Sequence, residues 1–130
     1  MASYVSSKCF KWDDVEIGEN CFILEGNVLQ SQVSIKDNVF LWSGNHIGHG
    51  SVISENCFIS SHVVVSGSCT VGKNCFIGVN SSIADGVTIG DDNFIAMSSS
   101  IFQNTDNGSI YKTPSSKKMT MTSNKYFKLD

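Results

Sequence analysis

The amino-acid sequence predicts an all-β fold in which short parallel strands wind into a three-sided coil, a parallel β-helix built from six-residue repeats. Three observations predict this fold. An aliphatic residue recurs at every sixth position, an aromatic residue recurs at every eighteenth, and residues that tolerate a left-handed backbone recur between them. The 130 residues are enough for one domain with one core.

The strands are predicted from the aliphatic repeat, which runs through fifteen positions without a slip. Two residues before most of these positions lies a small or β-branched residue, and residues two apart point to the same face of a strand. Each unit is therefore expected to be a short strand with two inward side chains, followed by a turn. The aliphatic positions are Ile17, Ile23, Leu29, Ile35, Leu41, Ile47, Ile53, Ile59, Val65, Val71, Ile77, Ile83, Ile89, Ile95 and Ile101.

The coils are predicted from the aromatic residues, whose spacing of eighteen indicates three strands per coil. Each aromatic residue precedes an inward position, so these side chains are expected to point outward and to stack as a ladder. Residues 15–102 then make about five coils of a β-helix domain over residues 1–102, and residues 103–130 form a Lys-rich C-terminal tail or cap. No helical period is found. The ladder consists of Tyr4, Phe22, Phe40, Phe58, Phe76 and Phe94.

The turns are predicted from the two residues that follow each strand and form a corner. At the second residue of the corner, ten of fourteen units have Gly, Asn or Asp. These residue types adopt positive φ at the lowest cost. This explains how a chain with a single proline can turn so often.

The cysteines fit the same repeat. Cys21, Cys57, Cys69 and Cys75 fall on the small inward position, and Cys9 does so when the repeat is extended backwards. Their number is odd and no Cys-x-x-Cys motif occurs. We therefore interpret them as small core residues with free thiols, and we expect no metal site.

The composition excludes several classes of partner. The chain has no Arg and a net charge of -3, so we expect no nucleic acid as partner. It has no apolar run of the ~20 residues that a membrane span requires, so we expect no membrane association. The N-terminus lacks the basic start and apolar stretch of a secretory signal, which makes a cytoplasmic location the expectation.

The sequence resembles the hexapeptide-repeat acyltransferases. Residues 45–49 (NHIGH), 65–67 (VSG) and 71–78 (VGKNCFIG) resemble the nucleotide-sugar N-acetyltransferases of that family, and residues 111–114 and 117–119 resemble their closing segment. The resemblance implies a left-handed β-helix and transfer of an acetyl group from acetyl-CoA to a nucleotide-linked 4-amino-4,6-dideoxy sugar. The same branch includes proteins similar to sialic-acid O-acetyltransferases. The chain begins where the sugar-nucleotide domain of such enzymes would end.

Two residues are the candidates for catalysis. Acetyl transfer needs a base for the attacking amine and a donor for the oxyanion. Gly67 follows His49 by eighteen residues, so the two are expected to be stacked about 5 Å apart in adjacent coils. In the family that the chain resembles, the position of His49 is the general base, and the position of Gly67 gives its N–H to the thioester oxygen.

Further residues are candidates for supporting roles. Asn45, His46 and His62 are candidate accessory residues; His46 resembles a second histidine of related acyltransferases, whereas His62 lies at a different corner from His49. The resemblance also assigns contacts with acetyl-CoA to a set that includes Gly67, and the lysines of the tail are candidates for holding the CoA phosphates. The candidate cofactor-binding residues are Phe58, Gly67, Val79, Met97 and Lys112.

The sequence departs from the family at two of its positions. Family members commonly carry Asp or Glu directly after the catalytic histidine, whereas this chain has Gly50. Glycine is usual at the position of Met97, where a bulky side chain narrows the space for the ligand.

Other functions compete with the N-acetyltransferase interpretation. The alternatives are a sugar O-acetyltransferase, a zinc-dependent carbonic anhydrase on the same fold, and a non-catalytic β-helix. The histidine spacing disfavours the carbonic anhydrase. We also expect a homotrimer, because a soluble monomer rarely leaves an aromatic ladder bare.

Overall fold

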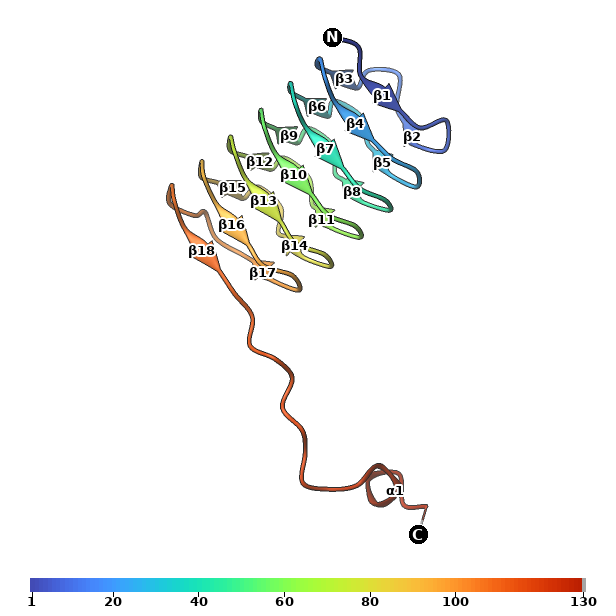
Figure 1. The fold of residues 1–130 in the computed structure, drawn as a ribbon, viewed down its shortest axis with the longest axis vertical. Coiled ribbons are helices and arrows are strands. Elements are labelled where there is room, and N and C mark those ends of the chain that lie inside the picture. The colour runs from blue at the N-terminus through green and yellow to red at the C-terminus, as the bar shows by residue number, and fades with distance from the viewer. Residues whose placement is uncertain (130) are drawn as a thin grey trace.

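The computed structural model describes residues 1–129, which form a parallel β-helix followed by an extended tail (Figure 1). Within the described residues, eighteen two-residue strands follow one another, three to a coil. Each strand from β1 to β14 pairs with the strand three positions further on, and the last strand, β18, pairs with β16. The predicted fold class is confirmed.

Three sheets form the three faces of the coil. The first sheet contains β1 (Tyr4–Val5), β4 (Phe22–Ile23), β7 (Phe40–Leu41), β10 (Phe58–Ile59), β13 (Phe76–Ile77), β16 (Phe94–Ile95) and β18 (Ile110–Tyr111). The second contains β2 (Phe10–Lys11), β5 (Val28–Leu29), β8 (His46–Ile47), β11 (Val64–Val65), β14 (Ser82–Ile83) and β17 (Ser100–Ile101). The third contains β3 (Glu16–Ile17), β6 (Ser34–Ile35), β9 (Val52–Ile53), β12 (Thr70–Val71) and β15 (Thr88–Ile89).

The register between coils follows the eighteen-residue period. Phe58, for example, aligns with Phe40 on one side and with Phe76 on the other. Backbone hydrogen bonds connect the coils: the Phe58 N–H donates to the Cys75 carbonyl at 2.9 Å, and the Ser60 N–H donates to the Ile77 carbonyl at 3.0 Å. We call the turn from the first to the second sheet the first corner, the turn from the second to the third sheet the second corner, and the remaining turn the third corner.

The core lies inside the coil and consists of the predicted inward residues. From Ile23 to Ile101 every aliphatic position of the repeat is at most 5% exposed. Ile17, in the first coil, is only partly buried and packs against this core. Apolar burial is the dominant favourable term in folding, so these residues carry most of the stability of the β-helix.

The β-helix has about six coils rather than the predicted five. Strands β1 and β2 precede residue 15, where the count began; Lys11 stands at an aliphatic position there and interrupts the pattern. At the other end β18 lies beyond residue 102, the predicted boundary, and continues the first sheet through Tyr111. The repeat fails in between because the last coil reaches β18 through an irregular segment, in which Thr105 is buried without belonging to a strand.

The corners adopt the predicted backbone conformation. In all fourteen units the second residue of the turn has positive φ. This includes four residues that are not Gly, Asn or Asp: Gln32, His62, Ser68 and Ser98. At the third corner a row of amide side chains reinforces the stack, with Asn38 donating to Asn56 and Asn56 to Asn74, both at 3.1 Å.

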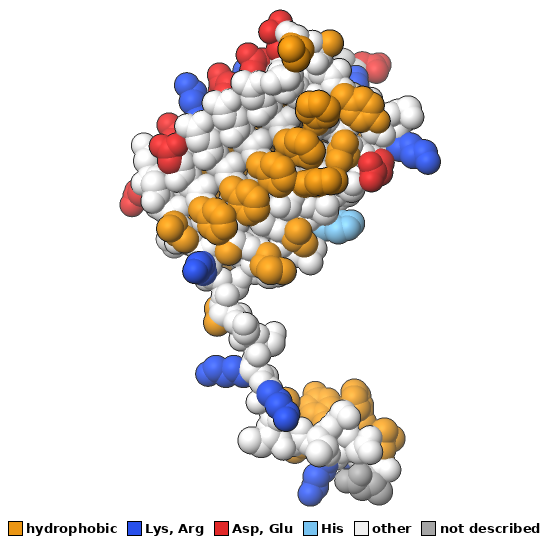
Figure 2. Space-filling model, viewed as in Figure 1, with side chains coloured by type: hydrophobic (Ala, Val, Ile, Leu, Met, Phe, Trp, Pro, Cys, Tyr) orange, Lys and Arg blue, Asp and Glu red, His pale blue; other side chains and the backbone are white. Residues whose placement is uncertain are grey.

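The aromatic ladder is confirmed as an outward row on the first sheet (Figure 2). The rings of Phe40, Phe58, Phe76 and Phe94 stack with centroid separations of 5.0 to 5.5 Å. Three members of the ladder stay exposed to solvent: Tyr4 is 53%, Phe22 is 47% and Phe94 is 44% exposed.

The cysteines lie where the repeat places them. Cys21, Cys57, Cys69 and Cys75 are buried, Cys9 is partly buried, and all five thiols are free. Each buried thiol donates to a carbonyl fifteen residues further along the chain, such as Cys57 to the Gly72 oxygen at 3.0 Å and Cys69 to the Ala84 oxygen at 3.1 Å. These contacts confirm their interpretation as small core residues.

The tail leaves the last coil and ends in a short helix, α1 (Ser123–Tyr126) (Figure 1). The sequence shows no helical period because α1 is a single turn. Its first turn is capped by the Thr122 hydroxyl, which accepts from the Lys125 N–H at 3.3 Å. Within residues 1–129, no helix is both long and apolar enough to cross a membrane.

Candidate functional site

The candidate site is at the second corner, where His49, Gly67 and Asp85 form a column with one residue from each of three successive coils. Together with Ser68 and Gly86 they line an open pocket of about 350 Å³. Gly67 is buried, whereas His49 and Asp85 are exposed. The predicted adjacency of His49 and Gly67 is therefore present in the structure.

The His49 imidazole lies directly over Gly67. A Cβ atom added to Gly67 would come within 2.7 Å of His49 Cε1 and within 3.2 Å of Nε2. Only glycine leaves room for the ring in this position. The backbone of His49 is fixed on both sides, because its N–H donates to Gln30 Oε1 at 3.0 Å and its carbonyl accepts from the Ser68 N–H at 2.8 Å.

The Gly67 N–H, the expected oxyanion donor, has a hydrogen-bond partner in this structure. It donates to Asp85 Oδ1 at 2.8 Å. Sequence reasoning missed Asp85, although the signal was available: Asp85 follows Gly67 by the same eighteen residues that separate Gly67 from His49. A carboxylate thus faces the pocket beside the imidazole.

The three accessory candidates lie in different surroundings. His46 is in β8, half-buried, and its neighbours along the second sheet are Val28 and Val64. His62 is at the first corner with φ 58°, where its ring packs against Gly44. Neither lines the His49 pocket.

Asn45 is a core residue, 1% exposed. Its side-chain oxygen accepts from the Val63 N–H at 2.8 Å, and its amide donates to the Trp42 carbonyl at 3.3 Å. The signal for this placement is in the repeat, because Asn45 lies two residues before Ile47 and therefore on the inward face. These contacts give Asn45 a structural role in the core.

The candidate cofactor-binding residues do not lie together in one chain. Phe58 is in the aromatic ladder, and Val79 and Met97 are stacked at the first corner, where the Ser98 N–H donates to the Val79 carbonyl at 2.8 Å. Met97 is 61% exposed and lines a second pocket, of about 400 Å³, with Thr113 and Pro114. Lys112 is exposed at the start of the tail. Gly67, at the second corner, is separated from these residues by the second sheet.

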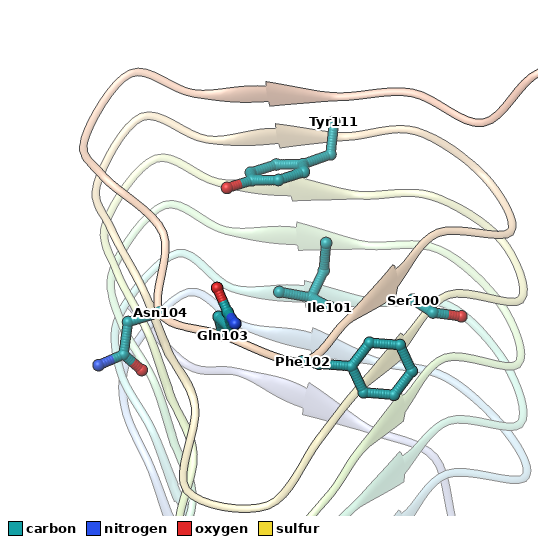
Figure 3. A pocket seen from close by; sticks show the side chains of 6 residues that line it. All are labelled: Ser100, Ile101, Phe102, Gln103, Asn104 and Tyr111. Atoms are coloured by element: carbon teal, nitrogen blue, oxygen red, sulfur yellow. The ribbon is translucent and has the colours of Figure 1, made fainter.

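A further pocket lies at the last coil and does not belong to the site. It is lined by Ser100, Ile101, Phe102, Gln103, Asn104 and Tyr111 (Figure 3). It exists because no later coil covers the end of the core, which Ile101 and Tyr111 close instead. Among residues 1–129, no three His, Cys, Asp or Glu side chains are grouped so that they could hold a metal ion.

Comparison with known proteins identifies the repeat. The family described as bacterial transferase hexapeptide (six repeats) matches residues 32–67 and 68–103. No curated protein sequence matches the chain.

Several solved structures share the fold. PerB from Caulobacter crescentus, solved with CoA and GDP-perosamine, is 19% identical with a TM-score of 0.83 over 85% of this chain and 53% of that chain. The acetyltransferase domain of PglB from Neisseria gonorrhoeae, solved with acetyl coenzyme A, is 18% identical with a TM-score of 0.81 over 83% of this chain and 53% of that one. A mutant of the N-acyltransferase AntD from Bacillus cereus, solved with dTDP and coenzyme A, is 18% identical with a TM-score of 0.55 over 96% and 83% of the two chains. The chain thus spans about half the length of the PerB and PglB structures it matches.

Proposed function

Because the chain belongs to the bacterial transferase hexapeptide family, we propose that it is an acetyl-CoA-dependent acetyltransferase. Its proposed acceptor is the amino group of a nucleotide-linked 4-amino-4,6-dideoxy sugar. One observation carries the proposal: the imidazole of His49 lies over the buried backbone of Gly67 in an open pocket. A base and a backbone donor are thus adjacent at a place that substrates can reach.

The proposed reaction uses His49 as the general base. The sugar amine attacks the thioester carbonyl carbon, and His49 accepts the proton that the amine loses. The carbonyl oxygen takes up negative charge and is stabilised by the Gly67 N–H. The C–S bond then breaks, the amide is formed, and the proton held by His49 passes to the departing CoA thiolate.

The structural neighbours support the choice of substrates. PerB was solved with CoA and GDP-perosamine, and the PglB domain with acetyl coenzyme A. Both share the fold with this chain over more than four-fifths of its length. CoA and a nucleotide-linked sugar are therefore the first ligands to test.

We place the cofactor between two subunits of a homotrimer. The candidate cofactor contacts Val79 and Met97 are at the first corner, whereas His49 and Gly67 are at the second. In the proposed arrangement the first corner of one copy meets the second corner of another, so that one ligand contacts both sets. The exposed aromatic ladder gives the copies an apolar surface for association.

The catalytic assignment is tested by His49→Ala. We expect kcat for acetyl transfer to a dTDP-, UDP- or GDP-linked 4-amino sugar to fall about 10²- to 10⁴-fold, the usual contribution of a general base. The matched control is Lys73→Ala. Lys73 is exposed and is the first residue of a turn at the third corner, as His49 is at the second. His46→Ala should cost less than His49→Ala, because His46 does not line the pocket. A His49→Ala enzyme that is folded by thermal melting and keeps its kcat would contradict the assignment.

The subunit arrangement is tested by Phe58→Glu, which places a charge between the stacked rings of Phe40 and Phe76. We expect the wild-type protein to sediment as a trimer and the variant to dissociate, because a charge in an apolar interface is costly to desolvate. A wild-type protein that stays monomeric at micromolar concentration rules out the trimer.

A further inference from the structure

The amide that the proposed reaction needs is already bonded to a carboxylate. The Gly67 N–H donates to Asp85 Oδ1 at 2.8 Å, and both residues line the pocket with His49. A hydrogen bond to an ionised acceptor is stronger than one to a neutral carbonyl. A thioester carbonyl that approaches Gly67 therefore competes with a better acceptor.

The same bond recurs elsewhere in the β-helix, which shows what is special about this instance. At the third corner, Asp37 Oδ1 accepts from the Glu19 N–H and Asp91 Oδ1 accepts from the Lys73 N–H, both at 2.8 Å. In each case the aspartate follows its donor by eighteen residues. These bonds satisfy corner amides that would otherwise lack a partner in the next coil. Only at Gly67 does the bonded amide lie beneath an imidazole and face the His49 pocket.

The two sides of the Asp85–Gly67 bond differ in their freedom to move. Gly67 is buried in the stack, and the peptide plane that carries its N–H is fixed because the Ser66 carbonyl of that plane accepts from the Ser51 hydroxyl at 2.8 Å. Asp85 is exposed, and its carboxylate can turn into water with little loss. The carboxylate is therefore the group that yields when another acceptor binds.

The charge of Asp85 also opposes the chemistry while it remains in place. A carboxylate at hydrogen-bond distance from the Gly67 nitrogen lies where negative charge develops on the thioester oxygen, and like charges repel. When the Asp85 carboxylate leaves the Gly67 amide, the Gly67 N–H becomes free to donate, and the negative charge of Asp85 moves away from the thioester oxygen at the same time.

We propose that Asp85 is a gate for the acyl thioester. Its carboxylate occupies the Gly67 N–H in the free protein and must leave it before the thioester carbonyl binds, so Asp85 lowers the affinity for acetyl-CoA. The assignment of the thioester carbonyl to the Gly67 amide rests on the proposed function.

The experiment measures the dissociation constants of acetyl-CoA and of CoA by calorimetry for the wild-type protein, Asp85→Ala and Asp91→Ala. We expect Asp85→Ala to bind acetyl-CoA roughly threefold to tenfold more tightly, the worth of an exposed hydrogen bond to a charged group. CoA, which has no thioester carbonyl, should bind the variant and the wild type equally. Asp91→Ala removes the equivalent bond at the third corner and should change neither constant.

The outcomes separate the gate from the proposed function. Acetyl-CoA that binds none of the three proteins overturns the acetyltransferase proposal itself. A second outcome overturns the gate alone. In that outcome acetyl-CoA binds the wild type, but Asp85→Ala leaves the ratio of the affinities for acetyl-CoA and CoA unchanged or shifts it in favour of CoA. An equal gain in affinity for acetyl-CoA in Asp91→Ala also overturns the gate, because the gain then comes from removing any aspartate bond of this kind at a corner and not from freeing the Gly67 N–H.

A spectroscopic readout follows the bond itself. In the ¹⁵N–¹H spectrum we expect the Gly67 amide proton to move upfield in Asp85→Ala, because the strong acceptor is lost. Added acetyl-CoA should shift the same resonance in the wild type, and CoA should not. A Gly67 resonance that is insensitive to Asp85→Ala contradicts the bond on which the gate depends.

Discussion

Replacing Gly67 by alanine tests the packing of the imidazole against the backbone. The added Cβ would lie 2.7 Å from His49 Cε1, 3.1 Å from Nδ1 and 3.2 Å from Nε2. Ordinary carbon–carbon contacts are about 3.5–4.0 Å, so the ring has to move by about 1 Å. Gly67 does not have a left-handed backbone, so alanine adds no backbone strain.

The expected consequence is a loss of activity with little loss of stability. The atoms that must yield belong to an exposed side chain, which can rotate into solvent. We expect the thermal midpoint of Gly67→Ala to stay close to that of the wild type. The proposed acetyl transfer should fall about 10²-fold, the usual effect of displacing a reacting group by 1 Å.

Gly48→Ala is the matched control, with the opposite expectation. A Cβ at Gly48 would lie 2.6 Å from the Gly67 nitrogen and from the Ser66 carbonyl carbon, which are backbone atoms of the next coil. They cannot move without disturbing the stack, so this variant should lose roughly 1–3 kcal/mol of stability.

The assay combines thermal unfolding, steady-state kinetics and the NMR signal of the His49 ring. In Gly67→Ala the ring signal should shift, and adding His49→Ala should remove any small loss of stability because the clash is then absent. The reasoning is refuted if Gly67→Ala unfolds as readily as Gly48→Ala, or if its ring signal and rate are those of the wild type.

Two further predictions concern the core. Burial raises the pKa of the Cys69 thiol, and a hydrogen bond with Cys75 together with burial raises the pKa of Cys57. Because the thiolate is the reactive form, we expect a disulfide reagent to label Cys57 and Cys69 slowly until denaturant is added, and burial restricts the access of the reagent to Cys21 and Cys75 as well. Rapid labelling of most of these thiols in the native protein would contradict the packing. Asn45→Ala leaves the buried Val63 N–H without its acceptor and should cost roughly 1–3 kcal/mol in urea unfolding, whereas a loss below about 0.5 kcal/mol would show that this bond is not needed.

The sequence predicted the coil because each of its requirements is local. An inward residue at every sixth position, such as Ile59, must be apolar to fill the interior, and a corner residue such as Asn56 must accept positive φ. The ends were harder to predict. Lys11 breaks the aliphatic pattern although β2 is formed, and β18 follows a segment that leaves the six-residue period. Backbone pairing with the neighbouring coil holds these two strands in place. The six-residue period of the sequence does not show that pairing, because the period is interrupted at both strands.

The sequence by itself determined that His49 and Gly67 are adjacent, because a coil of fixed length stacks residues eighteen apart. Only the tertiary structure decided what each group at the corner contacts. The imidazole covers Gly67, the Gly67 amide bonds to Asp85, and Val79 and Met97 lie beyond the second sheet at another corner. The physical reason is that the repeat specifies backbone positions. Hydrogen-bond partners depend on side-chain rotamers, and those are set by neighbours from different coils.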